Sequence, residues 1–330
     1  MASSNPATPK LLLWALGIQL VIGGLLIWQA ATDFALFRSD DGDTAPPARS
    51  EPAPAPAAEP GATAAAAVPR PRVDRFDAAA AMRWARRQVA LGPRPAGSEA
   101  ARRSGEMLAS ALPGARFVDL GPEHPGLRNI EASLPGRGKP ILLIAHYDTA
   151  PVAGHVGAND SAAGVGAVIE LARVLARTQR PGDRAITFLL TDGEEAPSLP
   201  VRGDFTEVAL RGSKAAAETM DPQWVIVLDF IAQKGLRIEH EAGSDPELWA
   251  RLRAAARRVG VQRVFPDVTR SEIFDDHTPF ARRGIPAIDL IDFDYPCWNR
   301  PCDTLDKLSV RSLDAAGEAV FELIRELRRR

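Results

Sequence analysis

Residues 141–177 read ILLIAHYDTAPVAGHVGANDSAAGVGAVIELARVLAR. The stretch opens with a short apolar run, 141–147, which lies between Pro140 and Asp148. A run of this length between turn residues predicts a buried strand. Over residues 163–177 the apolar side chains recur at helical spacing, and an Arg-Pro-Gly turn follows shortly after. We therefore expect one buried strand and then one amphipathic helix, which is the unit of an alternating α/β pattern.

The same alternation continues on both sides of this stretch. Further apolar runs predict strands at 186–190, 224–231 and 285–291, and helical spacing occurs at 76–91, 98–112 and 313–329. Near-continuous apolar strands between helices are typical of parallel sheets that are buried on both faces. We expect an α/β fold with a mostly parallel central sheet and helices on both faces, and in such sheets ligands bind at the carboxyl ends of the strands.

Ionisable residues follow the predicted strands. They are His146, Asp148, Asp192, Glu194, Glu195 and Asp229, with Asp160 in the loop before the long helix and the run Asp275-Asp276-His277 before the last strand. A single carboxylate of this kind would be an ordinary cap or turn residue. Several buried together are costly unless a cation or a proton neutralises them. Because imidazole and carboxylate ligands together suit zinc, the sequence predicts a zinc site at this edge of the sheet.

The N-terminal segment differs in character from the rest. Residues 11–31 carry no charge and are long enough for a helix to cross a hydrocarbon core. Lys10 before them and Asp33 after them favour a cytoplasmic location for residues 1–10. A cleaved signal peptide is the alternative, although the apolar stretch is longer than such peptides usually have. We therefore expect a single-pass membrane protein whose domain lies on the periplasmic or extracellular side.

A linker rich in Ala and Pro, residues 32–72, follows this segment and is typical of an extended tether. The folded domain is expected over residues 73–330. The formal net charge of -2 gives the chain no general attraction to nucleic acid, so no nucleic-acid partner is expected.

Six motifs in the domain carry a resemblance to a known family. In order they are AHYDT (145–149), GANDSAAGVGAVIELARVL (157–175), LLTDGEEA (189–196), VLDFI (227–231), DDHTPFARRGIPAIDLID (275–292) and DTLDKLS (303–309). The chain resembles the superfamily of zinc-dependent aminopeptidases that also contains the glutaminyl cyclases, from residue 76 to the C-terminus.

Three features bring the resemblance closer to the glutaminyl cyclases. They are the pair Asp275-Asp276 before His277, the long stretch from Glu195 to the Gly-Ser pair at 212–213, and Trp298, which matches a tryptophan of the cyclase substrate pocket. The resemblance implies an enzyme that cyclises N-terminal glutamine with loss of ammonia, with peptide or protein N-termini as substrates and zinc as cofactor.

The resemblance also assigns roles residue by residue. Asp160 and Glu195 match zinc ligands, and Glu194 matches the general acid and base. Asp229 and Asp275 match acids that hydrogen-bond around Glu194.

The chain departs from the family pattern at one metal ligand. Where the family reads Trp-His-Thr, this sequence reads Trp298-Asn299-Arg300. Because an amide oxygen is a poor zinc ligand beside imidazole, Asn299 should weaken the site. Three interpretations follow: the metal moves to His146, Asp160 and Asp229; a thiolate of Cys297 or Cys302 replaces the histidine; or the site is inactive and the domain only binds peptides. A disulfide between the two cysteines is favoured over a thiolate, since disulfides form outside the cytoplasm.

Two further hypotheses stand beside the cyclase. One is an aminopeptidase with two metals, in which His146 and Asp229 match ligands of the second metal and Glu194 is the base for a metal-bound water. The other is a membrane-tethered binding domain without catalysis. The remaining histidines have less prominent roles: His124, His155 and His240 lie in polar, loop-like surroundings and are expected to be solvated. His277 is expected to be a packing or supporting residue that Asp276 orients.

Overall fold

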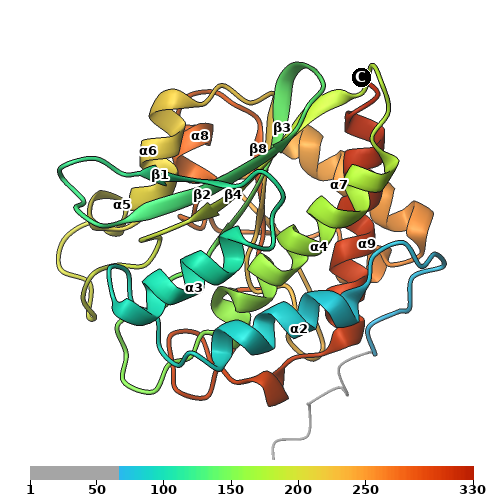
Figure 1. Ribbon diagram of the computed structural model, residues 1–330. Helices are drawn as coiled ribbons and strands as arrows, with labels where there is room; N and C mark the ends of the chain where they lie inside the picture. The colour runs from blue at the N-terminus through green and yellow to red at the C-terminus, as the bar shows by residue number, and fades with distance from the viewer. Residues whose placement is uncertain (1–66) are drawn as a thin grey trace, which may run out of the picture. The chain divides into compact units, whose positions relative to one another are not determined.

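The computed structural model describes residues 67–330, which form a central six-stranded sheet (Figure 1). The strands lie in the order β1-β2-β4-β3-β5-β8. β4, β3, β5 and β8 are parallel, whereas β2 pairs antiparallel with β4, and β1 pairs antiparallel with β2 at the edge. The bounds are β1 Arg116–Asp119, β2 Arg128–Leu134, β3 Arg137–His146, β4 Arg184–Thr191, β5 Trp224–Leu228 and β8 Ala287–Leu290.

Helices cover both faces of this sheet (Figure 1). The larger core packs α2, α4, α7 and α9 on one face, and a smaller core packs α6 and α8 on the other. The helices are α2 Ala78–Val89, α3 Glu99–Ala109, α4 Ala163–Thr178, α5 Phe205–Val208, α6 Arg211–Thr219, α7 Pro246–Val259, α8 Thr278–Ala281 and α9 Val310–Leu327. Shorter elements are η1 Ala158–Ala162, η2 Gln262–Val264, η3 Leu305–Lys307 and the two-stranded sheet of β6 His240–Glu241 and β7 Thr269–Arg270.

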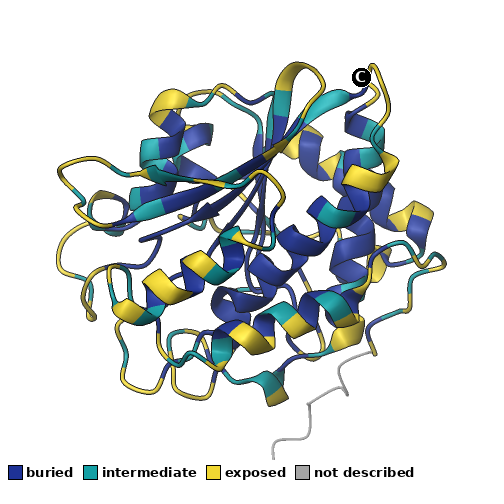
Figure 2. Cartoon of the chain, viewed as in Figure 1, coloured by how far each residue is buried: buried dark blue, intermediate teal, exposed yellow. Residues whose placement is uncertain are grey.

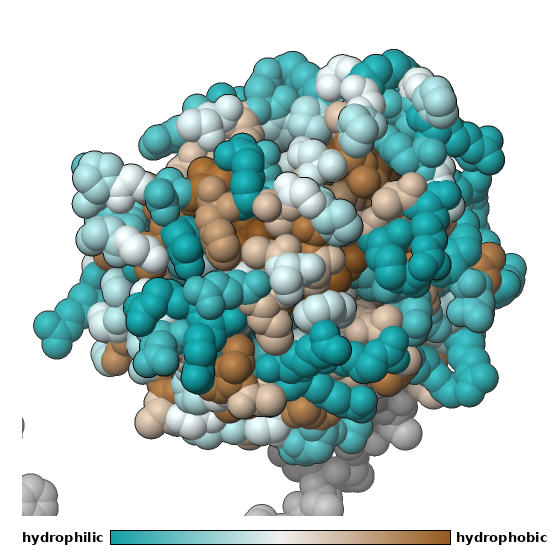
Figure 3. Space-filling model, viewed as in Figure 1, coloured by the Kyte–Doolittle hydropathy of each residue, from teal (hydrophilic) through white to brown (hydrophobic). Residues whose placement is uncertain are grey.

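The parallel strands are buried because successive side chains enter the two cores in turn. On β3, Leu143 belongs to the larger core and Leu142 to the smaller one, and every residue from Ile141 to His146 is buried. Figure 2 shows these strands in the buried colour, with exposed residues on the outer sides of α2 and α3. On the face drawn in Figure 3, hydrophobic residues are interspersed among hydrophilic ones.

The predicted α/β class, with a mostly parallel sheet and helices on both faces, is confirmed. The antiparallel strands β1 and β2 were not predicted. β2 reads RNIEASL, and its charged residues Arg128 and Glu131 interrupt the apolar run that marks the parallel strands. α7 was not predicted either.

The membrane helix predicted for residues 11–31, and the linker up to residue 66, lie outside the described residues. Val68 is only 8% exposed, and the N–H of Arg72 donates to the carbonyl of Val259 at 2.8 Å. Packing against the domain therefore begins at least five residues before the expected boundary at residue 73. Within residues 67–330, no helix combines the length and the apolar character that crossing a membrane requires.

Candidate active site

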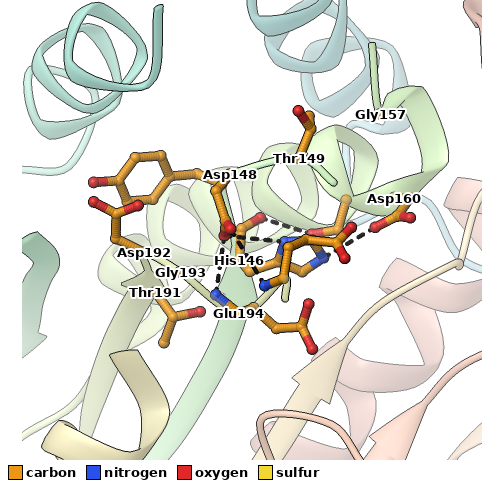
Figure 4. A network of polar contacts seen from close by, with 12 residues as sticks. His146, Asp148, Thr149, Gly157, Asp160, Thr191, Asp192, Gly193 and Glu194 are labelled. Carbon is orange, nitrogen blue, oxygen red and sulfur yellow. Dashed lines mark hydrogen bonds and ion pairs between the residues drawn. The ribbon is translucent and has the colours of Figure 1, made fainter. Parts of the chain in front are cut away.

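The carboxyl ends of the parallel strands bring the ionisable side chains together, as this class of fold leads one to expect. His146 is the last residue of β3, Glu194 and Glu195 follow β4, and Asp229 follows β5. Asp160 comes from η1, directly before α4. Figure 4 shows His146 between Asp148 and Asp160.

Three of these residues form what we call the His146 group: His146, Asp160 and Asp229. The Nε2 atom of His146 lies 3.2 Å from Oδ1 of Asp160 and 3.7 Å from Oδ1 of Asp229. Its Nδ1 atom lies 3.5 Å from Oδ1 of Asp148. Burial by itself lowers the pKa of His146, but the surrounding carboxylates, Asp148 first, raise that pKa well above its ordinary value. This histidine is therefore surrounded by negative charge.

A second cluster, the His155 group, consists of His155, Asp160 and Glu195. One ligand atom from each of these residues lies within 4.8 Å of the others. His155 is fully buried, with Nε2 3.7 Å from Oδ2 of Asp160 and Nδ1 3.0 Å from the carbonyl oxygen of Arg300. The expectation that His155 is solvated is wrong, since the side chain is fully buried. Its neighbours in the sequence do not reveal that Arg300, far along the chain, contacts its ring.

Asp148 fixes the two glutamates through their backbone. The N–H groups of Glu194 and Glu195 donate to Oδ1 and Oδ2 of Asp148 at 3.2 and 3.3 Å. Burial, together with the neighbouring carboxylates of Glu195 and Asp275, raises the pKa of Glu194 well above its ordinary value. Burial likewise raises the pKa of Glu195. A carboxyl group with a raised pKa can take up and release a proton near neutral pH, which general acid–base catalysis requires.

More acids lie behind these residues. Burial raises the pKa of Asp229 to about 8 and that of Asp276 to about 7. The hydroxyl of Thr191 donates to Oδ2 of Asp276 at 2.5 Å. The predicted orientation of His277 by Asp276 is wrong, since Nε2 of His277 instead faces Oε1 of Glu241 at 3.3 Å. The cluster thus holds more carboxyl groups than its histidines can neutralise, and their raised pKa values reflect burial first and then this crowding.

Two side chains that the sequence analysis did not single out support the loops of the site. The carboxylate of Asp303 accepts hydrogen bonds from the backbone N–H groups of Asn159 and Asp160 and from the hydroxyl of Tyr295. Arg94 is fully buried. Its guanidinium donates to the carbonyl oxygens of Gln88, Gly92, Tyr147, Val156 and Gly157. These contacts hold the segment between β3 and η1, which carries His155.

A pocket of about 570 Å³ opens beside these acids. Six acidic residues contribute to its lining: Asp160, Glu194, Glu195, Asp229, Glu272 and Asp275. The apolar part of the lining consists of Ala196, Leu199, Val201, Phe205, Phe230, Ile273, Phe274, Ile291, Phe293 and Trp298. The ring of Trp298 packs against that of Phe293 at 4.6 Å, and Trp298 is 45% exposed. The pocket can therefore take an apolar or uncharged side chain next to the acids.

A disulfide closes the short loop that includes Asn299. It joins Cys297 to Cys302, whose Cα atoms are 5.3 Å apart. The interpretation in which a cysteine thiolate replaces the missing histidine is therefore wrong, because both sulfur atoms are bonded to each other. Asn299 lines the pocket.

The predicted site residues come together. Asp160, Glu194, Glu195, Asp229, Asp275, Trp298 and Asn299 line one pocket, and His146 contacts two of them. The resemblance implied hydrogen bonds between Glu194 and the acids Asp229 and Asp275. Within residues 67–330, the side chain of Glu194 makes no such bond. Asp229 instead accepts from the N–H of Phe230 at 2.9 Å, and Asp275 accepts from that of Asp276.

The cluster fits a divalent cation such as zinc. Within residues 67–330, Nε2 of His155, Oδ2 of Asp160 and Oε1 of Glu195 are buried and have no hydrogen-bond partner. Leaving such groups unpaired is costly, and a cation that binds all three would remove the cost. The donor set of imidazole nitrogen and carboxylate oxygen is the one zinc prefers.

This fold and this site define an α/β protein of the zinc exopeptidase type. The chain belongs to peptidase family M28, whose family model matches residues 129–324. It is 28% identical to the glutaminyl cyclase of Porphyromonas gingivalis, with a TM-score of 0.69 over 77% of this chain and 99% of that one. It is 27% identical to a leucine aminopeptidase precursor from Bacteroides thetaiotaomicron, with a TM-score of 0.68 over 78% and 98%.

Curated relatives fall into the same two classes of enzyme. The chain is 25% identical over 196 residues to aminopeptidase YwaD of Bacillus subtilis, and 27% identical over 220 residues to the glutaminyl-peptide cyclotransferase-like protein of mouse. Each match covers 56% of this chain, and 41% and 56% of the respective relative. The chain thus spans about half the length of these relatives. Its homologues are enzymes that act on peptides, of both cyclase and aminopeptidase type.

Proposed function

We propose that the chain is a zinc-dependent glutaminyl-peptide cyclotransferase, which cyclises the N-terminal glutamine of peptides or proteins and releases ammonia. The observation that carries this proposal is the composition of one pocket. The three sequence features that resemble the cyclases all contribute to its lining: Asp275 from the acidic pair, Leu199, Val201 and Phe205 from the long stretch after Glu195, and Trp298.

The apolar lining suits this reaction because cyclisation needs no water. The attacking group is the α-amine of the substrate itself, held close to its own side-chain amide. Aromatic walls from Phe230, Phe293 and Trp298 would exclude water, which otherwise competes as a nucleophile.

In the proposed reaction the α-amine nitrogen bonds to the γ-carbonyl carbon, and the bond from that carbon to the amide nitrogen breaks. Glu194 accepts the proton that the amine loses and delivers it to the departing nitrogen, which leaves as ammonia. The raised pKa of Glu194, caused first by burial, suits both roles. Asp160 and Glu195 would hold the zinc ion, which when bound would polarise the γ-carbonyl as a Lewis acid.

An aminopeptidase is the second candidate, and the His146 group favours it. His146, Asp160 and Asp229 would hold a second metal beside the one at Glu195, as in two-metal hydrolases. Glu194 would then act as the base for water instead of the amine.

One assay separates the candidates. The full chain with zinc is incubated with two peptides that differ only in their first residue, glutamine or leucine. The masses of the products are then measured by mass spectrometry. Loss of ammonia from the glutamine peptide alone supports the cyclase. Release of the first residue would make the chain an aminopeptidase. If both peptides stay intact, both proposals are wrong and a peptide-binding domain is favoured. A parallel reaction with a chelator is the control for metal dependence.

We also propose that the domain works outside the reducing cytoplasm, which the Cys297–Cys302 disulfide supports. A protease added to cells whose outer membrane, where there is one, has been removed should digest the domain, whereas a cytoplasmic marker protein should survive. Protection of the domain together with the marker would contradict this location.

A further inference from the structure

We propose that His155 is the third protein ligand of the zinc ion, in place of the histidine that the family pattern has at the position of Asn299. The inference rests on the zinc that the proposed function requires, but it does not depend on which reaction the enzyme catalyses.

The first support is the position of the His155 ring. It is fully buried, and within residues 67–330 its Nε2 atom has no hydrogen-bond partner. That atom lies 3.7 Å from Oδ2 of Asp160, which is too far for a hydrogen bond. Oδ2 of Asp160 and Oε1 of Glu195 are buried and equally unpaired among the described residues. The three residues also bring one ligand atom each to within 4.8 Å of the others, as a single metal would need.

The second support is the tautomer of the ring. Nδ1 of His155 lies 3.0 Å from the carbonyl oxygen of Arg300, which can only accept a hydrogen bond. Nδ1 therefore carries a proton, and in the neutral ring the lone pair is on Nε2, which lies 3.7 Å from Oδ2 of Asp160. Metal-binding histidines are typically held in this way, with the second ring nitrogen donating to a carbonyl or carboxylate.

The third support is the origin of that carbonyl. Arg300 directly follows Asn299, inside the loop that the Cys297–Cys302 disulfide closes. The same carbonyl also accepts the N–H of Asp303 at 3.0 Å, which fixes its direction. The loop that lacks the family's histidine thus orients another histidine toward the same two carboxylates.

His146 differs from His155 in this respect. Carboxylate oxygens surround both of its nitrogens: Asp148 lies near Nδ1, while Asp160 and Asp229 lie near Nε2. Both nitrogens of His146 are also buried without a hydrogen-bond partner among residues 67–330, so no neutral acceptor fixes its tautomer, whereas the Arg300 carbonyl does so for His155.

The test is the zinc affinity of the metal-free full chain, measured by competition with a chelating dye. In His155→Asn the side-chain amide can still donate to the Arg300 carbonyl, but the Nε2 ligand is lost. We expect its zinc affinity to fall at least about 100-fold, since even an outer-shell partner accounts for roughly 10–100-fold. His240→Asn is the matched control, because His240 lies on β6 and belongs to neither histidine group. It should bind zinc within about 3-fold of the unaltered chain.

Two outcomes would overturn the inference. One is a His155→Asn variant that binds zinc as tightly as the His240→Asn control. The other is an Asn299→Ala variant that loses the affinity while His155→Asn keeps it. Zinc binding is measured without substrate, so the two proposals fail separately. If zinc affinity depends on His155 but the chain shows no cyclase activity, only the proposed function is refuted.

A measurement on the unaltered chain guards against a variant that misfolds. Crystals grown with zinc and measured at the zinc absorption edge should place an anomalous peak about 2.0–2.1 Å from Nε2 of His155. A peak bound by His146 or Asn299, with His155 not coordinated, would contradict the proposal.

Discussion

The His146 group and the His155 group share Asp160, yet they are built in different ways. His146 ends a central strand, where it pairs with Thr191 of β4, while β5 pairs with the same strand as far as Ile144. His155 lies in the segment between β3 and η1 and is held by contacts to Arg300 and, through the neighbouring Val156, to Arg94. The sheet therefore determines one histidine and long-range loop contacts determine the other. A lost ligand can thus be replaced from a loop without any change to the sheet.

Removing the shared carboxylate should have the largest effect. Asp160→Ala takes a ligand from both groups at once, so we expect zinc affinity to fall by at least about 1,000-fold, beyond the loss from any single outer-shell change. Dialysis against a zinc buffer followed by elemental analysis measures the bound metal. If one zinc ion per chain stays bound tightly, Asp160 is not a shared ligand, and the comparison of the two groups fails.

Glu194→Gln should separate chemistry from metal binding. Glu194 belongs to neither group, so zinc affinity should stay unchanged while kcat falls about 100- to 10,000-fold, the usual contribution of a general acid or base. Steady-state kinetics on a peptide with N-terminal glutamine, beside the dye competition, gives both numbers. Retained turnover would show that another group moves the proton.

Asp148→Asn should affect both groups moderately. Its carboxylate faces Nδ1 of His146 and accepts the N–H groups of Glu194 and Glu195, so it supports each group from outside. We expect a loss of zinc affinity of roughly 10–100-fold, the range for an outer-shell partner. The same Asp148→Asn change is also made in the His155→Asn variant. If it lowers zinc affinity by the same factor there as in the unaltered chain, Asp148 acts only on the His146 group.

The last prediction is a pH dependence of stability, which bears on the acids behind the two groups and not on the zinc ligands themselves. Burial raises the pKa of Asp276 to about 7 from an ordinary value of 3.8. Between these pH values the folded chain binds more protons than the unfolded chain, so the free energy of unfolding should fall as pH rises, by up to about 1.4 kcal/mol per pH unit for such a group. The burial penalty is absent below pH 3.8 and complete above about 7.

Thermal unfolding of the metal-free chain from pH 5 to 8 tests this sign. Tm should decrease with rising pH, and Asp276→Asn should make the decrease smaller. Added zinc should oppose the decrease, since a cation favours the ionised form of the nearby carboxylates. A Tm that rises over this interval would contradict the raised pKa.

Whether a site residue could be predicted from the sequence depends on whether a strand or a loop positions it. Strand ends were predictable, because a buried apolar run locates both the strand and the residue after it, as with His146 and Asp229. His155 was not predictable, because nothing in its own segment encodes the distant Arg300 carbonyl that covers and orients it. Asp303 was missed as a supporting residue for the same reason, since it contacts Asn159 from far along the chain.

The edge of the sheet illustrates the same limit. β1 and β2 are half-buried and carry charged residues, so their pattern does not separate them from a loop. The departure from the family pattern at Asn299, by contrast, was plain from the sequence. Its structural consequence was not, because this required knowing which other side chain reaches the same carboxylates.

Arg94 shows that the folded domain extends beyond the segment that the family model matches. That segment begins at residue 129, but Arg94 precedes it and donates to Tyr147, after the end of β3, and to Val156, beside His155. α2 also precedes residue 129 and packs in the larger core with α4 and α9. A chain cut at residue 129 would leave buried carbonyls unpaired and a helical layer exposed. The residues before the matched segment therefore support the active site as much as the motifs that identify the family.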